Sequence, residues 1–164
     1  PEIMTFAKGI ANGFPVGATI ATDEVASAFT GLSLSTFGGN PISMEAMNAT
    51  LDVMEREDVR RRSSERGAQL REYLDGFKER FDFIGDVRGM GLMQALELVE
   101  NRKTKEPSGK KTVKLLETAK KHGLLIGKGG LYGNVIRIAP SMLVTKSEID
   151  DGARRLEKAL AEVA

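Results

Sequence analysis

The first forty residues alternate between short apolar runs and turn-forming residues. Residues 3–7 form an apolar run, which is typical of a buried strand. The glycines and the Asn12-Gly13-Phe14-Pro15 sequence that follow predict a tight loop. A second strand over residues 16–21 should therefore lie antiparallel to the first. Residues 23–29 predict a short helix.

Two long helices are predicted next. Residues 31–39 are rich in glycine and hydroxyl side chains and predict a loop. Asn40-Pro41 is a strong helix start, because Asn caps the free N–H groups and Pro suits the first helical position. Apolar residues then recur at helical spacing in two sets, which are Met47, Leu51 and Met54, and then Leu70, Leu74, Phe77 and Phe81.

Beyond Phe81 the pattern changes to short apolar stretches, which predict strands at residues 92–99, 124–126 and 135–139. The polar residues 101–111 predict a mobile loop, and a helix from about residue 112 to 122 should end at Gly123. The last helix begins with a capping box from Thr145 to Glu148. One apolar stripe follows it, formed by Ile149, Ala153, Leu156, Leu160 and Val163.

The composition excludes several classes of function. The 164 residues include no cysteine, so no disulfide framework or thiolate chemistry is expected. The net charge of +1 is spread over interspersed acidic and basic residues, which argues against a nucleic-acid surface. No apolar run is long enough to cross a bilayer. We expect a soluble, cytoplasmic protein that binds neither nucleic acid nor membrane.

Lys8 is the first candidate for chemistry, because it stands where the predicted strand ends and the tight loop begins. A lysine at the rim of a core would lose solvation, and its neutral amine could attack a carbonyl to form a Schiff base. The alternative is a surface lysine that ends a strand.

Two further positions suggest binding of anions. Thr36 lies in the loop before a helix N-terminus, where free N–H groups and a hydroxyl can hold a phosphate, with Ser35 beside it. Alternatively, Thr36 only stabilises its own turn. Arg137 alternates with Ile136 and Ile138 in a strand, so its guanidinium needs either a carboxylate ligand or an internal ion pair, for example with Glu97.

Three other features are expected to be structural. Arg88 precedes Gly89-Met90-Gly91 and should bond loop carbonyls. Residues 127–130, Gly-Lys-Gly-Gly, lack the Ser/Thr and the helix of a nucleotide-binding loop. His122, the one histidine, is placed at a helix end, where it suits the helix dipole better than a metal site or a catalytic triad.

Several motifs in a fixed order carry a family resemblance. They are Ala7-Lys8-Gly9, the run from Asn12 to Ala18, the run from Ser35 to Pro41, the run from Gly85 to Met93, and the run from Ile136 to Met142. In this order they resemble class III pyridoxal-phosphate aminotransferases. Ala139-Pro140-Ser141-Met142 is most similar to the alanine–glyoxylate branch of that family.

The resemblance implies a cofactor, a fold and roles for the candidate residues. The cofactor would be pyridoxal 5'-phosphate, held by Lys8 as the catalytic amine, with Thr36 and Ser35 contacting the phosphate of the neighbouring subunit in a homodimer. Arg137 would bind the substrate carboxylate, and no metal is implied. The fold would be α/β, the C-terminal part of a type I transferase: residues 1–62 ending the large domain with its linking helix, and residues 63–164 forming a small α+β domain.

The phosphate loop, the ring-stacking aromatic residue and the Asp that pairs with the ring nitrogen in this family are not found in the sequence. We therefore interpret the chain as the C-terminal portion of a longer enzyme. The function implied first is transfer of an amino group from alanine, beta-alanine or a related donor to glyoxylate or pyruvate. The alternatives are another reaction of the same cofactor, such as that of a phospho-lyase, racemase or decarboxylase, or a non-catalytic assembly fragment.

Overall fold

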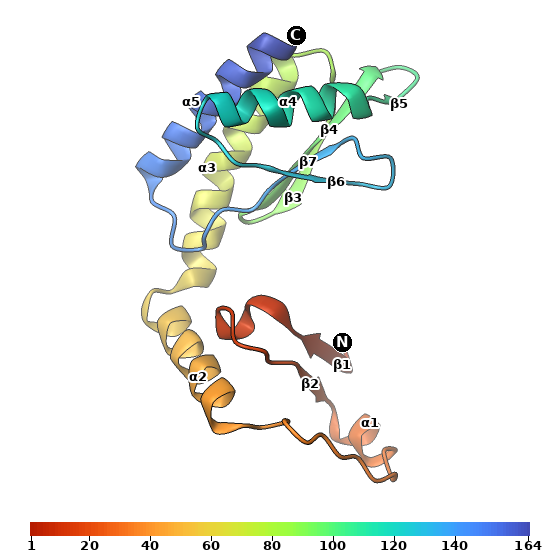
Figure 1. Cartoon of the computed structure of the whole chain (residues 1–164), viewed down its shortest axis with the longest axis vertical. Coiled ribbons are helices and arrows are strands. Elements are labelled where there is room, and N and C mark those ends of the chain that lie inside the picture. The colour runs from red at the N-terminus through yellow and green to blue at the C-terminus, as the bar shows by residue number, and fades with distance from the viewer. The chain divides into compact units, whose positions relative to one another are not determined.

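The computed structural model describes all 164 residues, which form two compact units, Pro1–Asp58 and Val59–Ala164. Figure 1 labels their helices and strands. The division falls in the turn between helix α2, Pro41–Arg56, and helix α3, Val59–Arg80. Asp58 in this turn has a positive φ of 44°. The sequence predicted the division a few residues later, between Arg62 and Ser63.

The first unit begins with the predicted antiparallel hairpin. Strand β1, Ile3–Phe6, pairs with strand β2, Ala18–Ala21, so that Ile3 faces Ala21 and Phe6 faces Ala18. The prediction that the first strand is buried is wrong for this chain. Ile3 and Met4 are 53% and 46% exposed, because no other part of the unit covers them.

Two helices follow the hairpin. The short helix α1, Asp23–Ser27, is capped by Thr22, whose side chain accepts a hydrogen bond from the Val25 N–H. Helix α2 begins as predicted, because the Asn40 side-chain oxygen accepts a hydrogen bond of 2.9 Å from the Ser43 N–H and Pro41 takes the first helical position. The 3-10 helix η1, Lys8–Ala11, packs against α2.

The second unit is an antiparallel sheet covered by helices on one face (Figure 1). The strands lie in the order β3-β4-β7-β6, with β5 pairing only with β4. Their bounds are β3, Ile84–Met90; β4, Met93–Asn101; β5, Glu106–Pro107; β6, Gly127–Gly129; and β7, Val135–Ile138.

The strand predictions here succeed only in part. Residues 92–99 and 135–139 correspond to β4 and β7, but the strand predicted at 124–126 is wrong, because the pairing starts at Gly127. Strand β3 was not predicted, since its glycines resemble a loop. The predicted loop at 101–111 instead contains β5 and the first turn of helix α4, Gly109–Lys121.

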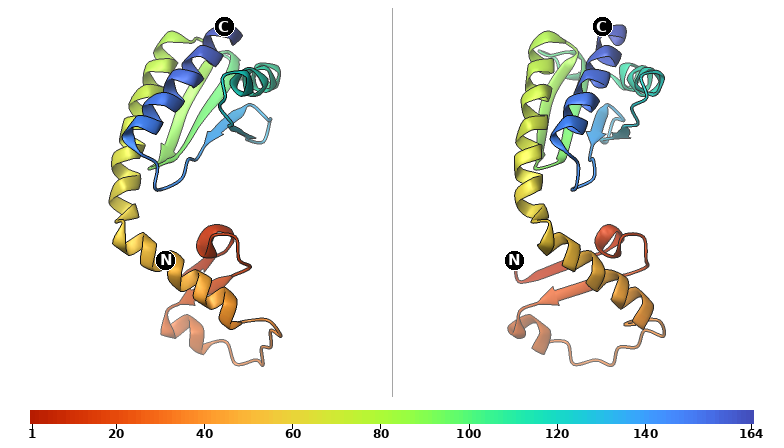
Figure 2. Two further views of the ribbon diagram at one scale, coloured as in Figure 1. Left: turned by 60° about the vertical axis from the view of Figure 1, so that its left-hand side comes forward. Right: turned by 90° about the vertical axis from the view of Figure 1, so that its left-hand side faces the viewer.

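The core lies between the sheet and the helices α3, α4 and α5, where α5 spans Lys146–Val163. Helices α3 and α5 run side by side in both views of Figure 2. The capping box is confirmed, since Thr145 N–H donates to Glu148 Oε2 at 2.7 Å and the Glu148 N–H donates back to Thr145 Oγ1 at 3.3 Å. The predicted stripe on α5 is buried throughout.

A close approach at Gly67 fixes α3 against the tip of the β3–β4 hairpin. A Cβ atom at this position would lie 2.3 Å from the backbone carbon of Gly91. We expect Gly67→Ala to lower the free energy of unfolding by about 1–3 kcal/mol, because backbone cannot yield as a flexible side chain does. Gly76→Ala is the matched control on the same helix, where nothing lies within 4 Å of the added atom. It should stabilise by up to about 1 kcal/mol through helix propensity.

Denaturant unfolding of both variants measures the two effects. Equal changes in stability for Gly67→Ala and Gly76→Ala would contradict the close approach.

Candidate functional site

Lys8 stands in strained backbone at the start of η1. Its φ of 59° is left-handed, although Lys has a Cβ, and the preceding Ala7 is fully extended. A left-handed conformation costs a non-glycine residue about 1–2 kcal/mol, and such strain is often found at functional sites. The side chain makes no hydrogen bond or ion pair and is exposed, so the expected desolvation of its amine is not found within this unit.

The geometry around Lys8 is set by the loop that follows it. Asn12 also has a positive φ, 47°, and its N–H donates to the Gly9 carbonyl at 3.1 Å. Ala11 is buried, which anchors η1 on the unit while Lys8 remains outside. The Lys8 amine is thus fixed at its backbone and accessible at its tip.

Ser35 and Thr36 lie in the turn directly before α2. The Ser35 carbonyl accepts a hydrogen bond of 3.2 Å from the Gly38 N–H, which closes the turn. Both side chains are exposed, and neither hydroxyl has a hydrogen-bond partner. The alternative in which Thr36 uses its hydroxyl to stabilise its own turn therefore does not describe this structure.

The surroundings of that turn suit an anion. Helix α2 is sixteen residues long and has no acidic side chain in its first turn. The positive end of its dipole is therefore not opposed by a carboxylate. Two free hydroxyls and a helix N-terminus form a donor set of the kind that holds a phosphate group.

Arg137 lies on β7 in the second unit. The two preceding residues, Val135 and Ile136, are buried, but the Arg137 side chain is exposed and has no ion pair or hydrogen bond. The proposed internal pair with Glu97 is not formed. Arg137 instead lines a pocket of about 310 Å³ whose other walls are mainly apolar, including Ile126, Ala139 and Leu156. An exposed and unpaired guanidinium is suited to binding a small carboxylate.

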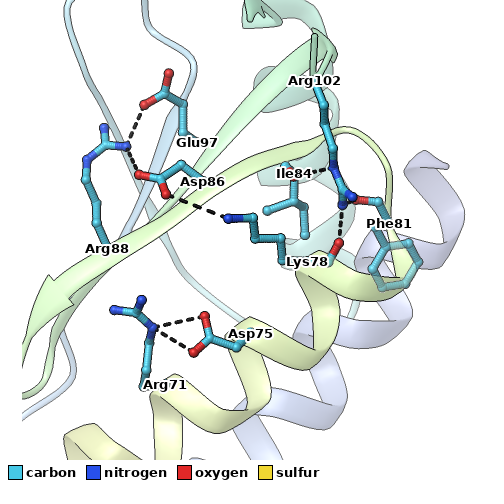
Figure 3. A network of polar contacts seen from close by, with 9 residues as sticks. All are labelled: Arg71, Asp75, Lys78, Phe81, Ile84, Asp86, Arg88, Glu97 and Arg102. Carbon is cyan, nitrogen blue, oxygen red and sulfur yellow. Dashed lines mark hydrogen bonds and ion pairs between the residues drawn. The ribbon is translucent and has the colours of Figure 1, made fainter.

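Glu97 is bound by Arg88, which sequence reasoning assigned to a loop. Arg88 lies within β3, and its Nη1 contacts Glu97 Oε2 at 2.5 Å and Asp86 Oδ2 at 2.9 Å (Figure 3). The expectation that Arg88 bonds loop carbonyls is therefore wrong, because the glycine-rich segment pairs as a strand and aligns Arg88 with carboxylates. The hydrogen bond that Arg88 donates to Asp86 lowers the pKa of Asp86, and the hydrogen bonds that Arg88 donates to Asp86 and Glu97 raise the pKa of Arg88.

Arg102 is a second arginine that the sequence did not single out. Its Nε donates to the Ile84 carbonyl at 3.0 Å, and its Nη2 donates to the Phe81 carbonyl at 3.0 Å and also to the Lys78 carbonyl (Figure 3). It therefore ties the end of β4 to the end of α3 and the start of β3.

The remaining candidates have structural surroundings. His122 ends α4 as expected, with Nε2 at 2.6 Å from Glu162 Oε1 and its carbonyl accepting from Arg155 Nη1. Residues 127–129 form β6, and no helix begins there. No set of three His, Asp or Glu side chains is arranged to hold a metal ion. None of the helices has the length and apolarity needed to span a membrane.

The candidate residues are divided between the units. Lys8, Ser35 and Thr36 belong to the first unit, and Arg137 belongs to the second. The first unit offers the two kinds of group that a cofactor with an aldehyde and a phosphate requires: a free amine at Lys8 for the aldehyde, and two free hydroxyls at Ser35 and Thr36 for a phosphate. The left-handed backbone of Lys8 could be anticipated from the sequence only because Lys8 stands between a predicted strand and a glycine. The Arg88–Glu97 pair could be found only once the pairing register of β3 and β4 was known.

Comparisons with known proteins agree with the family resemblance of the sequence motifs. Residues 1–160 match the family model described as aminotransferase class-III. The chain is 46% identical over 151 residues to alanine–glyoxylate aminotransferase 2 homolog 2, mitochondrial, of Arabidopsis thaliana, covering 92% of this chain and 32% of that protein. It is 35% identical to a leucine/methionine racemase of Thermococcus litoralis, covering 99% of this chain and 37% of the racemase.

A solved structure shares the fold. An amine transaminase from an uncultivated Pseudomonas species, in its PLP-bound form, superposes with a TM-score of 0.91 and 32% identity, covering 100% of this chain and 39% of that chain. The chain thus spans about a third of the length of the curated relatives it matches.

Proposed function

We propose, from the premise that this chain belongs to the class III aminotransferase family, that it forms the C-terminal part of an enzyme that moves an amino group from alanine, beta-alanine or a related donor to glyoxylate or pyruvate. The fold is the C-terminal part of the type I pyridoxal-phosphate transferase fold. The observation that carries the proposal is Lys8, a free amine on strained backbone at the end of a strand.

The cofactor of this family is pyridoxal 5'-phosphate, which when bound supplies an electron sink for the substrate α carbon. The Lys8 amine would hold it, and would then move a proton to and from that carbon as a general base and acid. Thr36 and Ser35 would donate hydrogen bonds to the phosphate of the cofactor held by the neighbouring subunit. Arg137 would pair with the substrate carboxylate through both arms of its guanidinium and so orient the reacting carbon.

The products of the full-length enzyme test the proposed reaction. Alanine and glyoxylate should give pyruvate and glycine in equal amounts, because one amino group is transferred for each oxo acid consumed. Incubation with alanine alone should give no more than one pyruvate per active site. Catalytic release of pyruvate without an acceptor would contradict amino transfer.

Racemisation is the second candidate, because a racemase is among the relatives at 35% identity. A racemase would convert L-alanine to D-alanine with no oxo acid added and none produced. Chiral chromatography of the same reaction mixture therefore separates the two functions. Rapid D-alanine formation with no glycine from glyoxylate would favour racemisation.

We also propose that the complete enzyme is a homodimer with shared sites, since the family resemblance assigns Thr36 to the phosphate of a neighbouring subunit. Neither Lys8→Ala nor Thr36→Ala homodimers should have full activity, but a mixture should regain some, because one of the two sites in a heterodimer then has both residues. The mixture of Lys8→Ala with Ser33→Ala, a nearby exposed hydroxyl, supplies the reference level. Absence of recovery after subunit exchange, verified by mass spectrometry, would contradict a shared site.

A further inference from the structure

The strand register places two arginines and one glutamate on the same open face of the sheet. Arg88 on β3 faces Ala95 on β4, and Ala95 faces Arg137 on β7. Residues that face each other across strands point to the same side of a sheet, and so do residues two apart along a strand. Glu97, two residues after Ala95, therefore lies diagonally between both arginines. Diagonal neighbours in an antiparallel pair are about 7–8 Å apart, which long side chains can span.

Glu97 thus has two possible cationic partners, and it contacts only one of them. Its Oε2 lies 2.5 Å from Arg88 Nη1, and Asp86 Oδ2 lies 2.9 Å from the same nitrogen (Figure 3). Asp86 lies across from Glu97 on β3, so Arg88 also neutralises the repulsion between two facing carboxylates. The Arg137 guanidinium remains without an ion pair.

The other features around Arg137 preserve its free guanidinium. Glu148 lines the same pocket, but its Oε2 accepts from both the N–H and the hydroxyl of Thr145 at 2.7 Å. Neither cross-strand neighbour of Arg137, Ala95 or Gly127, has a polar side chain that could bind the guanidinium. Glu97 and Glu148 are therefore both occupied by other partners.

We propose that Arg88 is a positioning residue that holds Glu97 away from Arg137 and so keeps Arg137 free for the substrate carboxylate. This inference rests on the proposed function, in which Arg137 is the carboxylate-binding group. Without Arg88, Glu97 would lose its partner and be free to pair with Arg137, the other arginine on the same face. It would then compete with the substrate as an internal carboxylate.

The test uses the full-length enzyme with its cofactor and compares alanine with a primary amine that has no carboxylate. We expect Arg88→Met to lower the ratio of the two kcat/KM values about fivefold, the size of a contact between exposed charges, mainly through a higher KM for alanine. Adding Glu97→Gln should restore the ratio, because the competing charge is then gone. A crystal structure of Arg88→Met should show the Glu97 carboxylate in contact with Arg137.

Arg71→Met is the matched control. This substitution also removes an arginine from a carboxylate partner, Asp75 at 2.9 Å, but on the exposed side of α3 and not on the sheet (Figure 3). The ratio of kcat/KM for alanine to kcat/KM for the amine should equal that of the parent enzyme.

Three results would overturn the inference. The first is an unchanged ratio in Arg88→Met while Arg137→Ala lowers it, which leaves the proposed role of Arg137 intact. The second is a double variant as impaired as Arg88→Met alone, which would indicate a purely structural arginine. The third is an unchanged ratio in Arg137→Ala, which overturns the proposed role of Arg137 together with this inference.

Discussion

Replacing Lys8 with alanine is expected to lower turnover of the full-length enzyme by about 10⁴-fold, because in the proposed mechanism one amine both holds the cofactor and transfers the proton. The visible absorbance of the lysine-bound cofactor should be lost at the same time. Both are measured on the same preparation, by spectrophotometry and by steady-state kinetics. The fold should be retained, since the Lys8 side chain makes no polar contact and is exposed.

The chain offers a closely matched control for this substitution. Lys105 is also an exposed lysine with a left-handed backbone, at φ 57° compared with 59° for Lys8. Lys105→Ala therefore reproduces the loss of a lysine from strained backbone without touching the site, and should leave the absorbance and kcat unchanged. A Lys8→Ala enzyme that still turns over at a rate close to the parent's would rule out the assignment.

Arg137→Ala should produce the second large effect, and it should depend on the substrate. A hydrogen bond to a charged group contributes about 1.5–3 kcal/mol, so kcat/KM for alanine should fall roughly 10- to 150-fold. Part of this loss should appear in kcat, because the carboxylate contact also orients the reacting carbon. A primary amine without a carboxylate should lose little. Steady-state kinetics with the two substrates measures the difference.

Arg137→Lys refines the comparison. Lysine keeps the positive charge but offers a single point donor instead of a planar fork, so an intermediate loss is expected for alanine. If alanine and the amine lose equal activity in Arg137→Ala, the arginine supports the fold and not the substrate.

Local signals explain which elements could be predicted from the sequence. Helix starts at Asn40-Pro41 and at Thr145 were predicted, because capping depends on residues at most a few positions apart. The hairpin of β1 and β2 was predicted, because turn residues separate two apolar runs. Short strands rich in glycine carry little such signal, so β3 was missed and β6 was misplaced.

Contacts between distant residues explain the errors in the candidate site. Lys8, Thr36 and Arg137 were singled out by residue type and motif, but their partners depend on tertiary structure. Glu97 was considered as a partner for Arg137, yet it lies diagonal to Arg88 as well, and only the strand register reveals that choice. The exposure of Ile3 and Met4 was also missed, because an apolar run does not indicate what covers it.

The three carbonyl contacts of Arg102 bear on the order in which the second unit folds. They join residues only 18 to 24 positions apart, so α3, β3 and β4 can close on one another within a single short stretch of chain. Contacts between residues close in sequence form quickly, because little chain entropy is lost in closing the loop. Strand β7 pairs with β4 across about forty residues and should join later. Arg137 lies on this late strand, so the arginine that we propose binds the substrate carboxylate would reach its position only when folding of the unit is nearly complete.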